Sequence, residues 1–143
     1  MRLTSRIIVA ATLAGSLVMG TQSPAAADYS NTVNAVGGGA RVEYTVLQLS
    51  HTLAWYSGVL RDTAADGRCA WVKVSVIRTF GLRDVVLTVA TVCGKGNSKR
   101  IWGNASTLGG PVIRGLKFEV CRSNSAGAYR TGCQTNEART LTR

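Results

Sequence analysis

The feature that most constrains the fold is a stretch bounded by two cysteines, Cys69 to Cys93. Within it, two runs of alternating apolar and polar or small residues flank a short centre that contains Gly81. Alternation with a period of two is typical of a β-strand with one buried face. The stretch therefore predicts a β-hairpin that its own two cysteines close.

The cysteine positions also predict the register of this hairpin. If the turn is centred on Gly81, Cys69 and Cys93 lie directly opposite each other. Opposite Cβ atoms in an antiparallel pair are about 4.5–5.5 Å apart, so a modest local twist allows a disulfide. The same register pairs Val76 with Val86 and sends one small, apolar face inward: Val72, Val74, Val76, Val86 and Ala90.

The first 27 residues have the pattern of an export signal. Arg2 and Arg6 supply a positive start, Ile7 to Met19 an apolar run, and Ala25 to Ala27 a small-residue cleavage site. The apolar run is shorter than the roughly 20 residues that a membrane helix needs. We expect residues 1–27 to be a cleaved signal peptide and the protein to be secreted and extracellular.

The remaining chain is the size of one small domain. Residues 28–41 are polar and end in three consecutive glycines, so we expect a flexible lead-in before an all-β domain over 42–143. Alternation predicts strands over 41–50, 53–60 and 111–121 besides the hairpin, and the region from 122 to 132 reads as a loop. These short strands predict a single antiparallel β-sandwich or small barrel.

The four cysteines form an even set in a small exported chain, which favours two disulfides and no free thiol. The hairpin register favours Cys69–Cys93, which leaves Cys121–Cys133, the pair that is also nearest in sequence. There is no Cys-x-x-Cys pair, and His51 is the single histidine, so we expect neither a metal site nor a cofactor.

Three segments carry a family resemblance: DTAADGRCAWVKV, VCGKG and VCRSNSAGAYRTGC. They are similar to segments of small secreted β proteins of Streptomyces and related actinobacteria, which share an Asp-Gly-x-Cys-Ala segment and a later Val-Cys-Arg segment before a final cysteine. The resemblance covers roughly residues 59–133. It implies export and a disulfide-bonded β fold, and it implies no activity, because those proteins are mostly uncharacterised.

The sequence offers no group of residues that we assign to catalysis. His51 is next to Ser50, but adjacent strand residues point to opposite faces, which favours a plain turn histidine. Carboxylates that could act in pairs are Asp62 with Asp66, in one turn, and the strand residues Glu43 and Glu119. Nothing selects a pair among them, and the turn pattern favours a structural role for the two aspartates over calcium binding.

The charge balance points to anionic partners. Without Arg2 and Arg6, 15 of the 17 basic residues remain against seven acidic ones, a net charge of +8. A surface this basic attracts cell-wall polymers, nucleic acid or acidic lipid headgroups. The alternative is that dispersed positive charge serves only solubility.

Two groups of residues are the candidates for polyanion contact. Lys95, Lys99 and Arg100 lie in one expected loop beside Trp102, and Arg78 and Arg83 flank the hairpin tip. Basic loops beside an aromatic ring can hold a phosphate backbone or stack on a sugar. The other large aromatic side chains are assigned to the core: Trp55, Tyr56 and Trp71.

The sequence thus predicts a secreted, non-enzymatic binding module whose partner is an anionic polymer or a secreted protein. Two alternatives stay open: an inhibitor of a secreted hydrolase, and a small secreted hydrolase that uses aspartate or glutamate.

Overall fold

The computed structural model describes residues 28–79, 81–106 and 112–139, so the expected signal peptide lies outside the described residues. The described chain is all β-structure. Its eight strands are β1 (Asp28–Asn34), β2 (Ala40–Ser50), β3 (Leu53–Asp62), β4 (Cys69–Arg78), β5 (Val85–Cys93), β6 (Ser98–Ser106), β7 (Ile113–Ser123) and β8 (Arg130–Arg139).

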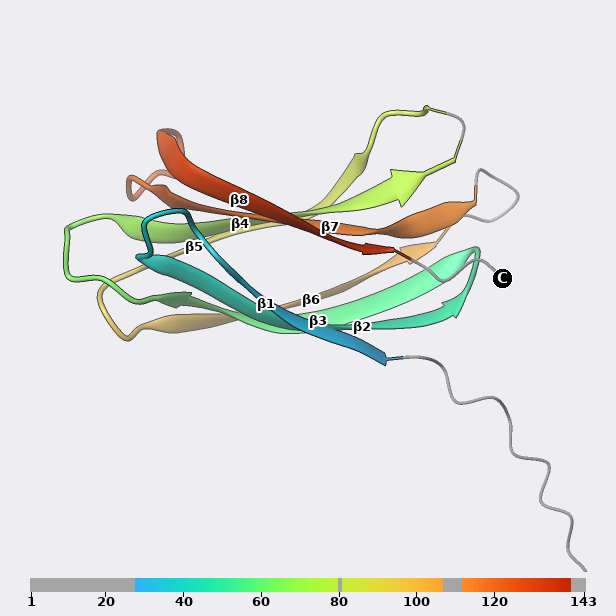
Figure 1. Ribbon diagram of the computed structural model, residues 1–143, viewed down its shortest axis with the longest axis horizontal. Coiled ribbons are helices and arrows are strands. Elements are labelled where there is room, and N and C mark those ends of the chain that lie inside the picture. Colours follow the sequence, from blue (N-terminus) through green and yellow to red (C-terminus); the bar gives the residue numbers. More distant parts are fainter. Residues whose placement is uncertain (1–27, 80, 107–111, 140–143) are drawn as a thin grey trace, which may run out of the picture.

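The strands form two four-stranded antiparallel sheets that pack face to face (Figure 1). Sheet A has the order β1-β2-β3-β6 and sheet B the order β5-β4-β7-β8. Of the two expected architectures, the sandwich is therefore confirmed. Strands β6 and β5 are edge strands, and they lie close to each other on one side of the sandwich.

Aromatic rings join the two sheets in the core. Tyr44 of sheet A stacks on Phe118 of sheet B with ring centroids 3.6 Å apart. Tyr56 meets the same phenylalanine edge-on at 5.9 Å, and its hydroxyl shares a hydrogen bond with the hydroxyl of Thr88. Small and branched side chains fill the space around these rings, among them Val42, Leu60, Val72, Val74, Leu116 and Val120.

Two glycines make room for the core tyrosines. Gly58 pairs with Tyr44 across β2 and β3, and Gly103 pairs with Tyr56 across β3 and β6. A Cβ atom at Gly58 would lie 2.6 Å from the carbonyl oxygen of Glu43, and one at Gly103 would lie 2.6 Å from the Tyr56 hydroxyl oxygen. Gly103 therefore leaves room for the Tyr56 ring, and Gly58 leaves room for the β2 backbone at Glu43 and Tyr44.

The hairpin β4–β5 has the predicted register over most of its length. Cys69 pairs with Cys93, and the register continues through Val74 opposite Thr88. A β-bulge after Val74 then shifts the pairing, so that Val76 lies opposite Val85 and not Val86. The expectation that Val86 faces inward is wrong: its side chain is 51% exposed, because the extra residue in β5 turns it outward.

Both predicted disulfides are present, Cys69–Cys93 and Cys121–Cys133, and none of the four cysteines is free. Each bridge joins neighbouring strands of sheet B, β4 to β5 and β7 to β8. Two disulfides are consistent with an extracellular protein, since such bonds persist in oxidising compartments.

The polar ends of the chain form more β-structure than expected. Residues 28–34, predicted to be lead-in without secondary structure, form edge strand β1, and the three glycines make the turn into β2. Residues 130–132, predicted to be loop, begin edge strand β8. Strand β1 is held in place by hydrogen bonds to β2, and strand β8 by hydrogen bonds to β7, although the polar sequences of both segments did not predict strands.

In the described residues we find no helix of the length and apolar character needed to cross a membrane.

Candidate functional site

The outer face of sheet A is built from rows of side chains that the strand register aligns. Every second residue of β1, β2, β3 and β6 points away from the core, and residues paired across the strands share a row. The first row is Thr32, Glu43, Val59 and Arg100; the second is Ser30, Thr45, Ser57 and Trp102; the third includes Leu47, Trp55 and Asn104.

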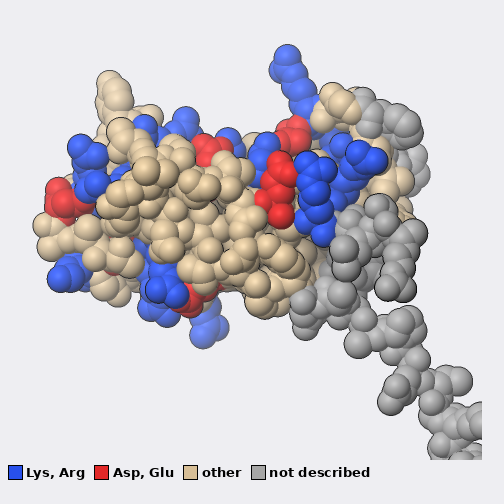
Figure 2. All heavy atoms as spheres, viewed as in Figure 1, with Lys and Arg blue, Asp and Glu red and all other residues tan. Residues whose placement is uncertain are grey.

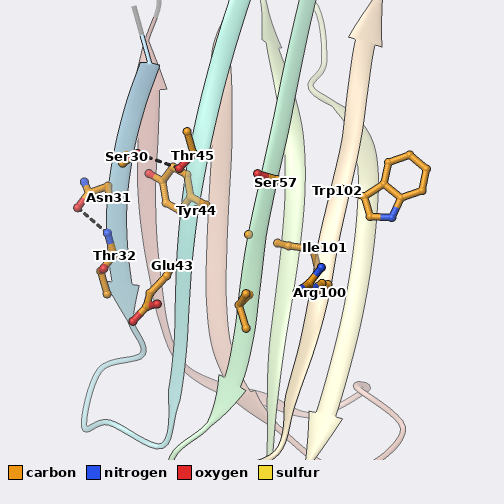
Figure 3. A pocket seen from close by; sticks show the side chains of 12 residues that line it. Ser30, Asn31, Thr32, Glu43, Tyr44, Thr45, Ser57, Arg100, Ile101 and Trp102 are labelled. Carbon is orange, nitrogen blue, oxygen red and sulfur yellow. Dashed lines mark hydrogen bonds between the residues drawn. The ribbon is translucent and has the colours of Figure 1, made fainter.

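Two adjoining depressions lie on this face, with volumes of about 770 and 380 Å³. Both are lined by Thr45, Ser57 and Trp102, so they form one continuous hollow, which we call the sheet A groove. The larger depression extends to Glu43 and Arg100, and the smaller one to Leu47 and Trp55. Figure 3 shows the larger depression, where Thr45, Ser57 and Trp102 belong to three neighbouring strands.

Two tryptophans of this groove are open to solvent. Trp102 is 73% exposed and Trp55 is 42% exposed, although Trp55 was expected in the core. That expectation is wrong because Trp55 shares its face of β3 with Val59, and this face turns out to be the outer one. The core side of β3 carries Tyr56 and Leu60, as expected for Tyr56.

Trp71, by contrast, is buried as expected, but not in the space between the sheets. It lies on the outer side of sheet B, where the loop of residues 124–129 folds back over it and a Cβ at Gly127 would lie 3.1 Å from its ring. The Arg130 guanidinium lies 4.5 Å from the ring centroid. The protein therefore carries one covered tryptophan and two exposed ones.

The charges around the groove are mixed and have an excess of arginine. Arg41 pairs with Glu43 at 2.6 Å. Arg61 and Arg100 also extend from the outer face of sheet A, on β3 and β6, and neither forms an ion pair with another described residue. The guanidinium groups of Arg61 and Arg100 can therefore bind an anion, because their planar N–H donors fit the oxygens of carboxylate, sulfate and phosphate groups.

The structure divides the basic loop expected over residues 94–100. Ser98 to Arg100 belong to β6, and only Lys95 lies in the β5–β6 turn. Lys99 pairs with Leu60 and so lies on the other side of β6 from Arg100, where it is exposed at the strand end. Of this group, Arg100 and Trp102 therefore line the groove, and Lys95 and Lys99 do not.

Arg78 and Arg83 lie at the opposite end of the molecule from Lys95. The nine residues of β5 separate the hairpin tip from the β5–β6 turn, a length of about 25 Å. The Arg78 guanidinium donates hydrogen bonds to the Arg83 carbonyl oxygen and thereby supports the hairpin tip. In Figure 2 the basic side chains likewise form several separate groups, with acidic side chains among them. The six candidate residues do not form one surface.

The four carboxylates considered for catalysis are each engaged elsewhere. Asp62 is buried, and its two oxygens accept hydrogen bonds from the backbone N–H groups of Ala64 and Gly94, at 3.2 and 2.8 Å. Asp66 pairs with Arg122. Glu43 and Glu119 lie on the outer faces of different sheets, and Glu119 pairs with Lys73 at 2.7 Å.

The other side chains considered for catalysis or metal binding have structural contacts among the described residues. His51 is exposed in the turn between β2 and β3, and its carbonyl oxygen accepts a hydrogen bond of 2.8 Å from the Ile113 N–H. Glu119, Cys121 and Cys133 are close together, but both sulfurs belong to the disulfide and are not thiolate ligands. Asp62 accepts hydrogen bonds from backbone N–H groups, and Asp66 forms an ion pair with an arginine. These contacts explain the positions of both carboxylates as parts of the turn.

The fold and the groove define the class: a disulfide-bonded β-sandwich with an open, aromatic and hydroxyl-rich outer face. Neither the protein-family models nor the curated proteins with which the sequence was compared match this chain.

Proposed function

We propose that this protein is a secreted, non-enzymatic binding module for an anionic polymer and that the sheet A groove is its binding site. One observation carries the proposal: two arginines and two exposed tryptophans lie on the same open face of sheet A. These residues are Arg61, Arg100, Trp55 and Trp102. Two of these residues were candidates from the sequence, and the sheet register supplies the other two.

The shape of the groove supports binding of an extended ligand. It is an open hollow on a rigid sheet, and it crosses strands whose register is fixed by hydrogen bonds. An open groove with arginines and exposed rings can hold one section of a long polymer while the rest of the polymer extends beyond it. The exposed rings add contact area at little cost in side-chain entropy.

The test is binding of a soluble polyanion as a function of salt, with two matched double variants. Arg61→Gln with Arg100→Gln removes two charges beside the groove, and Arg78→Gln with Arg83→Gln removes two charges at the far end. We expect the first variant to bind more weakly and to lower the slope of log K against log salt by about two. The second variant keeps the wild-type slope.

Equal losses in the two variants would show that binding depends on total charge and not on the groove. Absence of salt-dependent binding by the wild-type protein would refute the proposed function itself.

A second candidate, an inhibitor of a secreted hydrolase, is favoured by the surface of β5. This edge strand exposes Val85, Val86 and Val89, which are 42%, 51% and 56% exposed, and Leu82 precedes it. Exposed apolar side chains on an unpaired strand edge are typical of surfaces that add a partner's strand. This reading predicts a one-to-one protein complex that Val86→Lys with Val89→Lys abolishes and that high salt leaves intact.

A further inference from the structure

We infer that the anionic polymer is an acidic polysaccharide, whose sugar rings pack on Trp55 and Trp102 in the sheet A groove. This inference rests on the proposed function and adds the chemical class of its ligand. It comes from three properties of the groove: the arrangement of the two indole rings, the mixture of hydrogen-bonding groups between them, and the two arginines at one end.

The two tryptophans are placed as neighbours across two strands. Trp55 of β3 pairs with Asn104 of β6, and Trp102 lies two residues before Asn104. Diagonal neighbours of this kind have Cα atoms about 7–8 Å apart. Both indoles line the smaller depression, so a ligand that crosses it can contact both tryptophans. A sugar ring offers the matching surface, because its axial C–H groups form an apolar face.

The groups between the tryptophans and the first row both donate and accept hydrogen bonds. Ser30 and Thr45 share a hydrogen bond of 2.8 Å, and each hydroxyl keeps further lone pairs, as does that of Ser57. Glu43 adds a carboxylate to the same face, where it can only accept. Sugar hydroxyl groups can satisfy both kinds of partner.

A nucleic acid fits this set less well. Its phosphate oxygens only accept hydrogen bonds, so they cannot pair with the Glu43 carboxylate, which also only accepts. The groove therefore favours a chain that carries many hydroxyl groups and a limited number of charges.

The arginines determine where these charges bind. Arg100 is in the first row, and Arg61 lies one row further along the same face of β3, beside the groove. From Trp55 to Arg61 the strand rises by about 20 Å, which is long enough for several sugar units. A carboxylate or sulfate at the arginine end and uncharged ring faces at the tryptophan end match this arrangement.

The experiment compares four probes at physiological salt by titration calorimetry: an alginate hexasaccharide, a heparin hexasaccharide, inorganic polyphosphate and single-stranded oligothymidylate. The variants are Trp55→Ala with Trp102→Ala, the same two positions changed to Phe, and the far-end Arg78→Gln with Arg83→Gln as control. Both tryptophans are exposed, so we expect the tryptophan variants to keep the wild-type melting temperature within a few degrees.

We expect at least one hexasaccharide to bind more tightly than polyphosphate and oligothymidylate. The double alanine variant should lose about tenfold or more in affinity for it, as for other ligands that stack on an aromatic ring. The double phenylalanine variant should recover most of this loss, and the far-end variant should bind like the wild type.

Tighter binding of oligothymidylate than of either hexasaccharide would overturn the inference in favour of nucleic acid. Equal binding of all four probes, unchanged by the alanine variant, would overturn it while the proposed polyanion function stands. Binding of none of the four probes would refute both.

Discussion

At the scale of single residues, Tyr44 and Tyr56 connect the two sheets. Both have a raised pKa, mainly because burial disfavours the charged phenolate, and the nearby Tyr29 adds to the effect for Tyr44. The hydrogen bond with Thr88 opposes the rise in the pKa of Tyr56. Both groups therefore keep their protons in the folded protein at a pH where the unfolded chain loses them.

This difference predicts alkaline destabilisation. A raised folded-state pKa means that the folded protein binds more protons than the unfolded chain above pH 10, so the free energy of unfolding falls as the pH rises from about 10. Urea unfolding at pH 9, 10 and 11 measures the decrease, and Tyr44→Phe should make it shallower. An equal slope in Tyr44→Phe would show that other groups cause the pH dependence.

The Tyr56 hydroxyl gives a second prediction at this scale. Tyr56→Phe removes the hydrogen bond to Thr88 across the core and should cost about 1 kcal/mol of unfolding free energy. The matched control is Tyr29→Phe, because the Tyr29 hydroxyl accepts a hydrogen bond from the exposed Asn31 side chain. Urea unfolding should place this control within about 0.5 kcal/mol of the wild type.

At the scale of strands, the alternating pattern predicted the strands that have an apolar face of their own. It missed strands that are ordered mainly by hydrogen bonds to a neighbouring strand. The hairpin from Cys69 to Cys93 was predictable because small apolar residues repeat along β4. Strand β1 was not, since Val33 is the one buried residue among the described side chains of Tyr29 to Asn34 and the strand is ordered by pairing with β2. The bulge after Val74 could not be predicted from the sequence, because the residue opposite Val76 is a valine in either register, Val85 with the bulge and Val86 without it.

The two disulfides give a prediction for the same elements. In the chain-entropy model, each ring stabilises the fold by about 3 kcal/mol. Cys69→Ala with Cys93→Ala, and separately Cys121→Ala with Cys133→Ala, should each lower the unfolding free energy by about this amount in urea. A loss below about 1 kcal/mol for the first pair would show that strand pairing alone holds β4 to β5.

At the scale of the whole molecule, the candidate site could be predicted only in part. The sequence pattern does not show which face of each strand packs against the second sheet. The sequence predicted Arg100 and Trp102, because they follow a basic segment. It assigned Trp55 to the core, since alternation shows which residues share a face but not which face meets the second sheet. Arg78 and Arg83 share only their charge with the other candidates, and the length of β5 separates these two arginines from Lys95.

The distribution of tryptophans predicts two fluorescence populations. Iodide should quench the emission of Trp55 and Trp102 in the folded protein and spare Trp71, which the 124–129 loop covers. Changing both exposed residues to Phe should leave one weakly quenched, blue-shifted emission. Strong quenching in that variant would mean that the covering loop opens in solution.

The positions of the disulfides have one further consequence. Both bridges staple sheet B, whereas the outer face of sheet A contains neither a cysteine nor one of the fully buried core side chains. Residues on that face can therefore be exchanged without disturbing oxidative folding or the packing between the sheets. The molecule is thus a scaffold whose outer sheet A face can diversify, by selection or in a display library, while its covalent framework stays constant.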